Sequence, residues 1–553
     1  LPCLLAVTLP PYLADTSLLS SAFIAPLLVG IAWIITYPTL YFMTYKNSAV
    51  SFSYHFDIVI GLYLSSFFIC LSILCAHFHI MSLPVIILFS VLEFILLLIP
   101  VFQLSYYDIY HACISETGMM AVQQTDKNEA LEFLYAFPWK TKIISIGALI
   151  CLGTLLLYCN ISAATTLSHI SLDIKAIVFL TALTIFLAYY LSRPDPETGA
   201  FLRTGFMELY IDVKEYFKVS GQYTAYHQAN LPNLEVNLST PLPEKPQTFI
   251  LVIGESASRD HMSLFSNYER DTTPWLSAHK NSSEFFLFKN SYACWHQTVP
   301  VLERALTELN QYNAKTFNTS FSILDIAKKA GFNTYWFSNQ GYVGSVDTPV
   351  TLIANTADRA AWTKQEITKK QCDDALLEYL PTVDPTKNNF IIFHLMGSHD
   401  NFQTRYPEEF TIWGTPGKYH LIDNYDNSLA YTDYLLKEIY TYATEHLNLQ
   451  GLVYFSDHST IPDKRRQPDF TDFLTVRIPM FVYLSDNYQK AHPDVSLALR
   501  KHENSYWTND LTYDLVCGIL KVQSPNYDAT QSLASSEYRF SRENLTTLLG
   551  EMP

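Results

Sequence analysis

Five apolar runs of about 20 residues, all in the first third of the chain, are the feature that most constrains how this sequence can fold. About 20 helical residues cross the hydrocarbon core of a bilayer, and a charged side chain at its centre costs about 2.5–3.5 kcal/mol. Residues 1–192 hold only five Lys/Arg and nine Asp/Glu. If these five runs were buried helices of a soluble protein, the rest of the chain would supply too little polar surface to cover them. The sequence therefore predicts five transmembrane helices, near 21–43, 57–79, 82–103, 143–162 and 174–192.

The other 361 residues hold 74 charged side chains, which is typical of a water-soluble domain. Between the two parts, Phe201–Tyr223 has an apolar face that predicts one or two interfacial helices, and four prolines follow within 231–246. We therefore expect a transmembrane domain over 1–192, interfacial helices and a linker over 193–246, and a soluble domain over 247–553. The formal net charge of −16 opposes binding to polyanions, so no nucleic acid partner is expected.

The membrane part contains two further signals. Leu1–Ser20 lacks a basic n-region, so no cleavable signal peptide is expected. Glu93 lies in the middle of the third apolar run. An intramembrane carboxylate is either a functional group or a hydrogen-bonded packing residue, and the sequence leaves both interpretations open.

In the soluble part, short apolar runs alternate with helical patterns. The runs are 248–253, 333–338, 389–396, 451–456 and 479–484, and the helical patterns lie near 301–312, 321–331, 372–380 and 424–446. Continuous apolar strands interleaved with helices predict an α/β domain with a mostly parallel central sheet that is covered on both faces.

Ligands of such sheets bind at the carboxyl ends of the strands, so we consider the residues that follow each run. Glu255 follows the first strand, and the pair Asp457-His458 follows the strand at 451–456. His394 lies near the end of the strand at 389–396, and His399 follows it. Carboxylate and imidazole ligands suit a divalent metal such as zinc. Each group alone is also compatible with a helix cap or an ordinary turn.

A candidate nucleophile, Thr298, precedes Val299-Pro300 and a helical pattern from Val301. Proline just inside a helix start is common, so Thr298 is expected at a helix N-terminus, where unpaired N–H groups favour anions such as phosphate. The alternative is that Thr298 only caps the helix.

These segments together resemble a known family. The stretches FILVIGESASRDHMSLFSNYERDTTPWLS (249–277), HLMGSHDNFQTRYP (394–407) and YFSDH (454–458), with the Thr298 segment and the five spans, are similar to the membrane-bound phosphoethanolamine transferases of Gram-negative envelopes. That family belongs to the alkaline phosphatase/sulfatase superfamily. The sulfatase signature of Cys or Ser followed by x-Pro-x-Arg is absent, which disfavours sulfate-ester hydrolysis.

The resemblance implies a zinc ion held by Glu255, Thr298, Asp457 and His458, with Thr298 as the nucleophile that attacks phosphatidylethanolamine. His399 would act as an acid or base or contact the phosphoryl group, and His394 would contact the substrate. Thr125 and Glu129 match the loop that binds the lipid head group in relatives. The basic residues Lys464–Arg466 are either an acceptor-binding group or simply solvated.

The pattern also departs from the lipid A enzymes of this family. Only Cys294, Cys372 and Cys517 lie beyond residue 246, so the usual disulfide framework is missing. Phe470 lies near the place of a second substrate histidine, and Ala121 replaces an expected asparagine. The disulfide-poor pattern resembles more closely the branch that modifies the lipopolysaccharide core.

The family's location is the bacterial inner membrane, with the catalytic domain in the periplasm. By the positive-inside rule, the few lysines between the spans favour the opposite orientation. We adopt the periplasmic orientation that the resemblance implies. Two alternatives remain: a glycerol-phosphate transferase resembling lipoteichoic acid synthase, and a catalytically silent membrane scaffold for envelope assembly.

Overall fold

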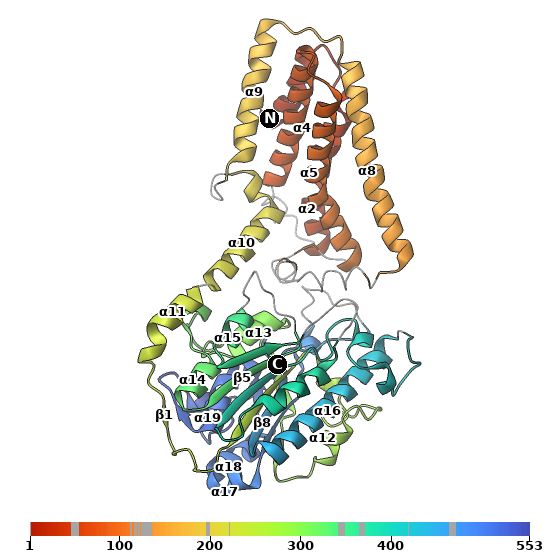
Figure 1. Ribbon diagram of the computed structural model, residues 1–553. Coiled ribbons are helices and arrows are strands. Elements are labelled where there is room, and N and C mark those ends of the chain that lie inside the picture. Colours follow the sequence, from red (N-terminus) through yellow and green to blue (C-terminus); the bar gives the residue numbers. More distant parts are fainter. Residues whose placement is uncertain are drawn as a thin grey trace. The chain divides into compact units, whose positions relative to one another are not determined.

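The computed structural model shows five long helices and an α/β domain (Figure 1). The chain divides into two compact units, and the longest continuous part of the second, residues 216–466, begins within helix α10 (Gly205–Ser220). The domain limits drawn from the sequence stay a prediction. The structure describes residues 2–45, 55–110, 113–114, 119, 122, 135, 137–194, 199–220, 222–340, 349–363, 371–418, 420–463 and 472–552.

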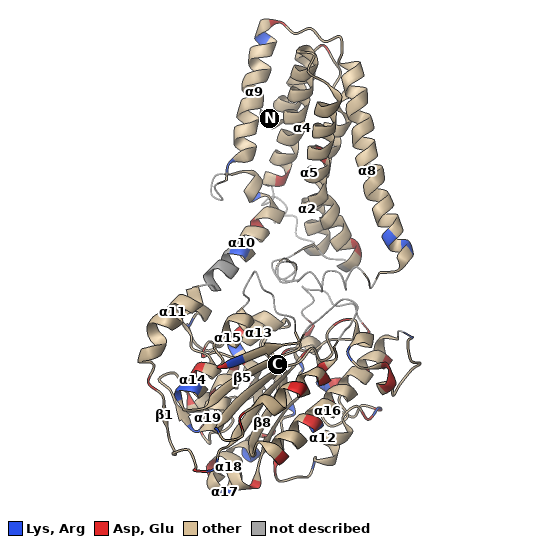
Figure 2. Cartoon of the chain, viewed as in Figure 1, with Lys and Arg blue, Asp and Glu red and all other residues tan. Residues whose placement is uncertain are grey.

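Apolar helices make up most of the first unit. The five that are long and apolar enough to cross a membrane lie in Ser21–Thr44, Phe56–His77, Leu83–Ile109, Trp139–Thr166 and Ile174–Ser192, which confirms the predicted spans. Figure 2 shows few charged residues along them. The described α-helices up to residue 192 are α1 (Pro2–Leu13), α2 (Ile24–Tyr45), α4 (His55–His77), α5 (Leu83–Tyr110), α8 (Trp139–Thr166) and α9 (Ile174–Ser192).

Glu93 is fully buried on α5 and pairs with a polar residue of a neighbouring helix. The Asn160 amide on α8 donates to Glu93 Oε2 at 2.6 Å and to Ser90 Oγ at 3.1 Å. Hydrogen bonds between polar side chains join transmembrane helices. The structure thus supports the interpretation of Glu93 as a hydrogen-bonded packing residue between α5 and α8.

The segment after the spans is helical, as the apolar face of Phe201–Tyr223 predicts. It contains the short 3₁₀ turn η3 (Phe201–Arg203), α10, and α11 (Gln222–Asn230). On α11, His227 Nε2 lies 2.8 Å from Asp325 Oδ2, and both side chains are buried. This contact fastens α11 to α14 (Ile323–Lys329) of the second unit, to which both helices belong.

A seven-stranded sheet forms the centre of the second unit, in the order β3-β9-β8-β2-β7-β5-β6. Strands β8, β2, β7, β5 and β6 run parallel, and β9 and β3 are antiparallel to their neighbours, so the mostly parallel sheet is confirmed. The strands are β2 (Thr248–Gly254), β3 (Phe285–Leu287), β5 (Asn333–Ser338), β6 (Arg359–Trp362), β7 (Asn389–His394), β8 (Leu449–Ser456) and β9 (Met480–Leu484).

Helices cover both faces of this sheet because the side chains of its strands alternate between two cores. On the fully buried β2, Phe249, Leu251 and Ile253 enter one core, while Ile250 and Val252 enter the other. The first core is closed by α13 (Thr298–Ala305), α14, α15 (Pro349–Ala354), α17 (Asp486–Ala491), α18 (Pro493–His502) and α19 (Thr512–Leu520). The second is closed by α12 (Pro274–Ala278), the 3₁₀ segment η7 (Asp373–Thr382) and α16 (Leu421–His446).

Two predicted helices differ from the structure. The pattern near 301–312 forms the shorter α13, which ends at Ala305 because Thr307 pairs with Ser322 in an isolated bridge. The pattern at 372–380 forms the 3₁₀ segment η7, which contains Pro381. Two further short strands matter for the site: β4 (Asn290–Tyr292) pairs in parallel with β10 (Tyr506–Thr508).

Candidate active site

The carboxyl ends of three parallel strands bring the predicted site residues to one edge of the sheet. Gly254, the last residue of β2, is in register with Ser456, the last residue of β8. Ile253 of β2 is in register with His394 at the end of β7. Glu255 therefore leaves β2 beside the point where Asp457 leaves β8, as the strand pattern predicts.

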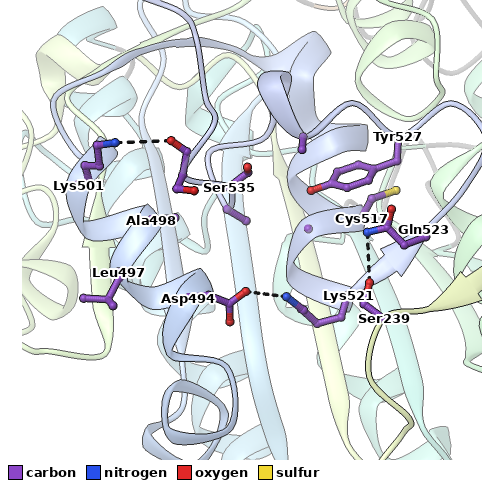
Figure 3. Close-up of a pocket in the computed structure, with 14 residues that line it drawn as sticks. Ser239, Asp494, Leu497, Ala498, Lys501, Cys517, Lys521, Gln523, Tyr527 and Ser535 are labelled. Atoms are coloured by element: carbon purple, nitrogen blue, oxygen red, sulfur yellow. Dashed lines mark hydrogen bonds and ion pairs between the residues drawn. The ribbon is translucent and has the colours of Figure 1, made fainter.

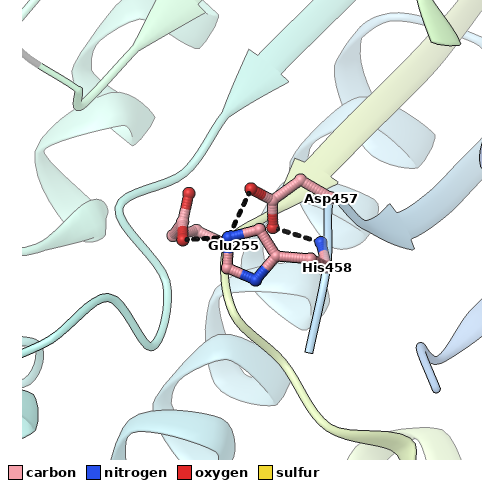
Figure 4. A group of neighbouring side chains, drawn as sticks. All are labelled: Glu255, Asp457 and His458. Atoms are coloured by element: carbon pink, nitrogen blue, oxygen red, sulfur yellow. Dashed lines mark hydrogen bonds and ion pairs between the residues drawn. The ribbon is translucent and has the colours of Figure 1, made fainter. Parts of the chain in front are cut away.

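Glu255, Asp457 and His458 form a buried group whose ligand atoms all lie within 4.8 Å of one another (Figure 4). His458 Nε2 lies 3.4 Å from Glu255 Oε1 and 3.4 Å from Asp457 Oδ2. The other ring nitrogen, Nδ1, lies 3.0 Å from the carbonyl oxygen of Ser459. A proton on Nδ1 would satisfy that carbonyl and leave the Nε2 lone pair facing the two carboxylates, which is the tautomer that a metal ligand needs.

The charges of this group also fit a cation. Burial raises the pKa of Asp457 well above its usual range, and the adjacent Glu255 raises it further. Two main-chain N–H groups, of Ser256 and His458, donate to Asp457 Oδ1 at 3.0 and 2.7 Å. Two buried carboxylates and an imidazole nitrogen make a donor set that suits zinc, whose charge would offset the repulsion between the carboxylates.

Thr298 is the first residue of α13, and its hydroxyl faces the same carboxylates. Its Oγ1 lies 2.7 Å from Asp457 Oδ2 and 3.1 Å from Glu255 Oε2. The helix is capped by Gln297, without a side-chain hydrogen bond. Thr298 therefore does not act as the helix cap, and its side chain belongs to the carboxylate group instead.

The two predicted histidines differ in environment. His394 is buried, with Nδ1 3.4 Å from Ser338 Oγ, and Nε2 has no hydrogen-bond partner in the described part of the chain. Burial lowers the pKa of His394 to about 4, so the ring is neutral near pH 7. His399 is partly exposed and lies in the turn that follows β7. Thr125, Glu129, Lys464–Arg466 and Phe470 lie outside the described residues.

Three residues that the sequence did not predict, Gln340, Gly397 and Asp373, hold Glu255 and its surroundings in place. The amide of Gln340 donates to Glu255 Oε2 at 3.1 Å and to the carbonyl oxygen of Leu395 at 2.9 Å. Gly397 has a left-handed φ of +48°, and a Cβ there would lie 2.8 Å from the carbonyl oxygen of Glu255.

Asp373 fixes the loop that contains Gly397. Its buried carboxylate accepts the N–H groups of Met396 and Gly397, both at 2.8 Å, and the Asn339 amide at 2.7 Å. The sequence around Asp373 is simply amphipathic, so no local signal distinguishes it. Asn509, whose amide donates to the carbonyl oxygen of Asp457 at 2.7 Å, also has no local signal in the sequence.

A separate hollow of about 480 Å³ lies among α18, α19 and the strands β1 (Asn237–Leu238) and β11 (Val522–Gln523), as Figure 3 shows. Its charged lining is partly neutralised, because Lys521 Nζ lies 2.7 Å from Asp494 Oδ2. None of the predicted site residues in the described part of the chain lines it. We assign this hollow no role in catalysis.

The fold and the site define the class of protein. Residues 247–516 match the sulfatase family, so this part of the soluble domain is a sulfatase-family domain.

The relatives narrow this class to the phosphoethanolamine transferases, which confirms the resemblance seen in the sequence. Phosphoethanolamine transferase EptC of Escherichia coli strain K12 is 27% identical over 482 residues, which cover 79% of this chain and 80% of that protein. The periplasmic domain of Escherichia coli EptC in complex with zinc is 26% identical, with a TM-score of 0.50, over 56% of this chain and 91% of that domain.

An integral membrane protein of known structure shows that the likeness in fold extends to the spans. The integral membrane lipooligosaccharide phosphoethanolamine transferase A of Neisseria meningitidis aligns over 92% of this chain and 97% of that protein, with a TM-score of 0.58 and 17% identity. At this identity the likeness concerns the fold alone. It agrees with five membrane helices that precede a sulfatase-like domain.

Proposed function

We propose that this protein transfers phosphoethanolamine from phosphatidylethanolamine to an envelope acceptor, lipopolysaccharide, with zinc as cofactor. The observation that carries the proposal is the position of the Thr298 hydroxyl, 2.7 Å from Asp457 and 3.1 Å from Glu255 at the start of α13. The names of the relatives and the zinc complex of the EptC domain support it. We place the protein in the bacterial inner membrane, with the catalytic domain in the periplasm.

Thr298 Oγ1 forms the new bond to phosphorus, and the bond from phosphorus to the diacylglycerol oxygen breaks. The hydroxyl contacts Asp457 and Glu255, which hold it in position, and its proton is released to solvent when the hydroxyl ionises. Zinc, when bound by Glu255, Asp457, His458 and Thr298, supplies positive charge that favours the ionised hydroxyl.

The leaving diacylglycerol oxygen needs a proton, and we assign this proton to His399 in the loop after β7. His394 is neutral near pH 7, so its Nε2 is suited to hydrogen bonding with the substrate rather than to charge pairing. Thr125 and Glu129 are proposed to bind the ethanolamine head group. In the second half of the reaction an acceptor hydroxyl or phosphate oxygen attacks the phosphothreonine, and Thr298 regains its proton.

Intact-mass spectrometry tests the first half of this reaction. The purified protein is incubated with phosphatidylethanolamine and zinc, beside Thr298→Ala and a matched variant, Thr307→Ala. Thr307 is a threonine shortly after Thr298 in the chain, but its hydroxyl donates to the main-chain oxygen of Glu303 and not to the carboxylate group. We expect an adduct of about 123 Da on the native protein and on Thr307→Ala only. An adduct on Thr298→Ala would refute the nucleophile.

The acceptor is tested in cells that produce the protein or Thr298→Ala. We expect added phosphoethanolamine on the lipopolysaccharide core, because the disulfide-poor soluble domain resembles that branch of the family. Among the described residues, which include all nine cysteines, no disulfide bond is present, which agrees with that pattern. Modification of lipid A alone would move the acceptor to lipid A. Transfer of glycerol phosphate, or no adduct with zinc bound, would favour one of the two alternatives.

A further inference from the structure

One buried amide, that of Asn509, links the nucleophile segment to the metal-ligand corner. Asn509 Oδ1 accepts the N–H of Cys294 at 2.9 Å, and Cys294 lies four residues before Thr298. Asn509 Nδ2 donates to the carbonyl oxygen of Asp457 at 2.7 Å and to that of Ser456 at 3.4 Å. The side chain is fully buried. A single group thus bonds to both segments that meet at the candidate site.

The surrounding backbone extends this link along the nucleophile segment. Before Asn509, β10 runs parallel to β4, with Thr508 opposite Tyr292. After it, the 3₁₀ turn η11 (Asn509–Leu511) packs against α13, the helix that begins at Thr298. Residues 506–511 therefore lie beside the nucleophile segment on both sides of the Asn509 amide.

The chemistry of the gap favours an amide over other side chains. The gap presents one donor, the N–H of Cys294, and one close acceptor, the carbonyl oxygen of Asp457, beside the more distant carbonyl oxygen of Ser456. Asparagine offers an acceptor and a donor at the same distance from the backbone. Aspartate would place a buried negative charge beside the Asp457 carbonyl oxygen, and alanine would leave both groups without a partner.

We propose that Asn509 is a positioning residue for phosphoryl transfer, which sets the distance between Thr298 and the metal ligands Asp457 and His458. Asn509 does not reach the reacting atoms, and it acts through the backbone of the residues that do. The proposal rests on the proposed function for its rate measurement. Groups that orient metal ligands typically contribute about 10- to 100-fold in metal affinity or activity, and we expect a loss of that size here.

The test compares Asn509 with an asparagine that is equally buried but lies at the other end of the sheet. Asn389, the first residue of β7, is also fully buried, and its amide donates to the carbonyl oxygen of Asp384 at 2.9 Å. The full-length protein in detergent is compared with Asn509→Asp, Asn509→Ala, Asn389→Asp and Asn389→Ala. For each, we would measure the apparent Tm, zinc retention against a chelator, and kcat and KM for phosphatidylethanolamine at saturating zinc.

We expect both Asn509 variants to lose about 10- to 100-fold in kcat at full zinc occupancy, with KM changed less than kcat. Zinc release to the chelator should be faster than in Asn389 variants of similar Tm. Asn389 variants should keep kcat within about twofold even where Tm falls. If either Asn509 variant that folds has native kcat and native zinc retention, or if Asn389 variants of equal Tm lose as much, the proposal is wrong.

Failure of the proposed function would look different. In that case the native protein itself would not transfer phosphoethanolamine, while the zinc comparison would still separate the two sets of variants. If zinc retention were also equal in Asn509 and Asn389 variants of matched Tm, the positioning role of Asn509 would be refuted independently of the substrate.

Discussion

Replacing Gly397 with alanine tests how closely the loop after β7 approaches Glu255. Gly397 has a φ of +48°, and a Cβ there would lie 2.8 Å from the carbonyl oxygen and 2.9 Å from the nitrogen of Glu255. Both are main-chain atoms, so no flexible side chain can move away. The contact is relieved only if the Glu255 backbone or the loop shifts.

The expected cost has two parts. A left-handed backbone costs an L-residue about 1–2 kcal/mol, and overpacking a dense interior costs about 1–3 kcal/mol more. Gly331→Ala is the matched control, because Gly331 has a φ of +93° and a Cβ there would meet only Leu242 Cδ1, at 3.6 Å. The control should therefore show the backbone cost alone, and Gly397→Ala should unfold at a Tm about 2–6 °C lower than the control.

The two variants should differ more in zinc binding and in rate than in stability. Displacing Glu255 by a few tenths of an ångström weakens one ligand of the proposed zinc, and misplacement by about 1 Å can cost about 100-fold in rate. Thermal unfolding, zinc content after dialysis and phosphoethanolamine transfer measure these effects. The reasoning is refuted if Gly397→Ala matches Gly331→Ala in all three.

Three further outcomes are expected. Asp457→Asn should lower zinc affinity by about 100-fold or more, because it removes a charged ligand; unchanged zinc stoichiometry by metal analysis would contradict this. His399→Ala should slow diacylglycerol release while zinc content stays native, and equal loss of both would argue against a proton-transfer role. Burial raises the pKa of Asp514 to about 8. The folded state then binds this proton more tightly than the unfolded state does, so stability falls as the pH rises from about 4 to 8. Asp514→Asn should flatten this dependence of Tm on pH, and an unchanged slope would exclude Asp514 as its source.

The elements that carry a strong local pattern could be predicted from the sequence. The run 333–338 matches β5 at both ends, because its centre, Tyr335–Phe337, consists of aromatic residues, which favour strands. The run 389–396 extends two residues beyond β7. The strand ends early because the N–H groups of Met396 and Gly397 bond to Asp373 instead of to a neighbouring strand.

Residues that the sequence places directly after strands could be predicted to lie together, and Glu255, Asp457 and His458 do so. Their roles stay a proposal. Asn509, Asp373 and Gln340 could not be found in this way, because their contribution consists of hydrogen bonds to residues far along the chain. No periodicity or spacing near Asn509 reports a bond to Cys294, which lies 215 residues away.

The pairing of residues 506–511 with the nucleophile segment also bears on the order of folding during synthesis. During synthesis, β4 and Thr298 leave the ribosome long before β10. Asn290 of β4 and its partner Tyr506 of β10 are 216 residues apart in the chain. Contacts of such high sequence separation form late, because loop closure must precede them. Nascent chains that stop short of Asn509 therefore hold both carboxylates and the threonine without the segment that aligns them. The candidate site is therefore aligned only late in folding, when most of the sheet has already formed.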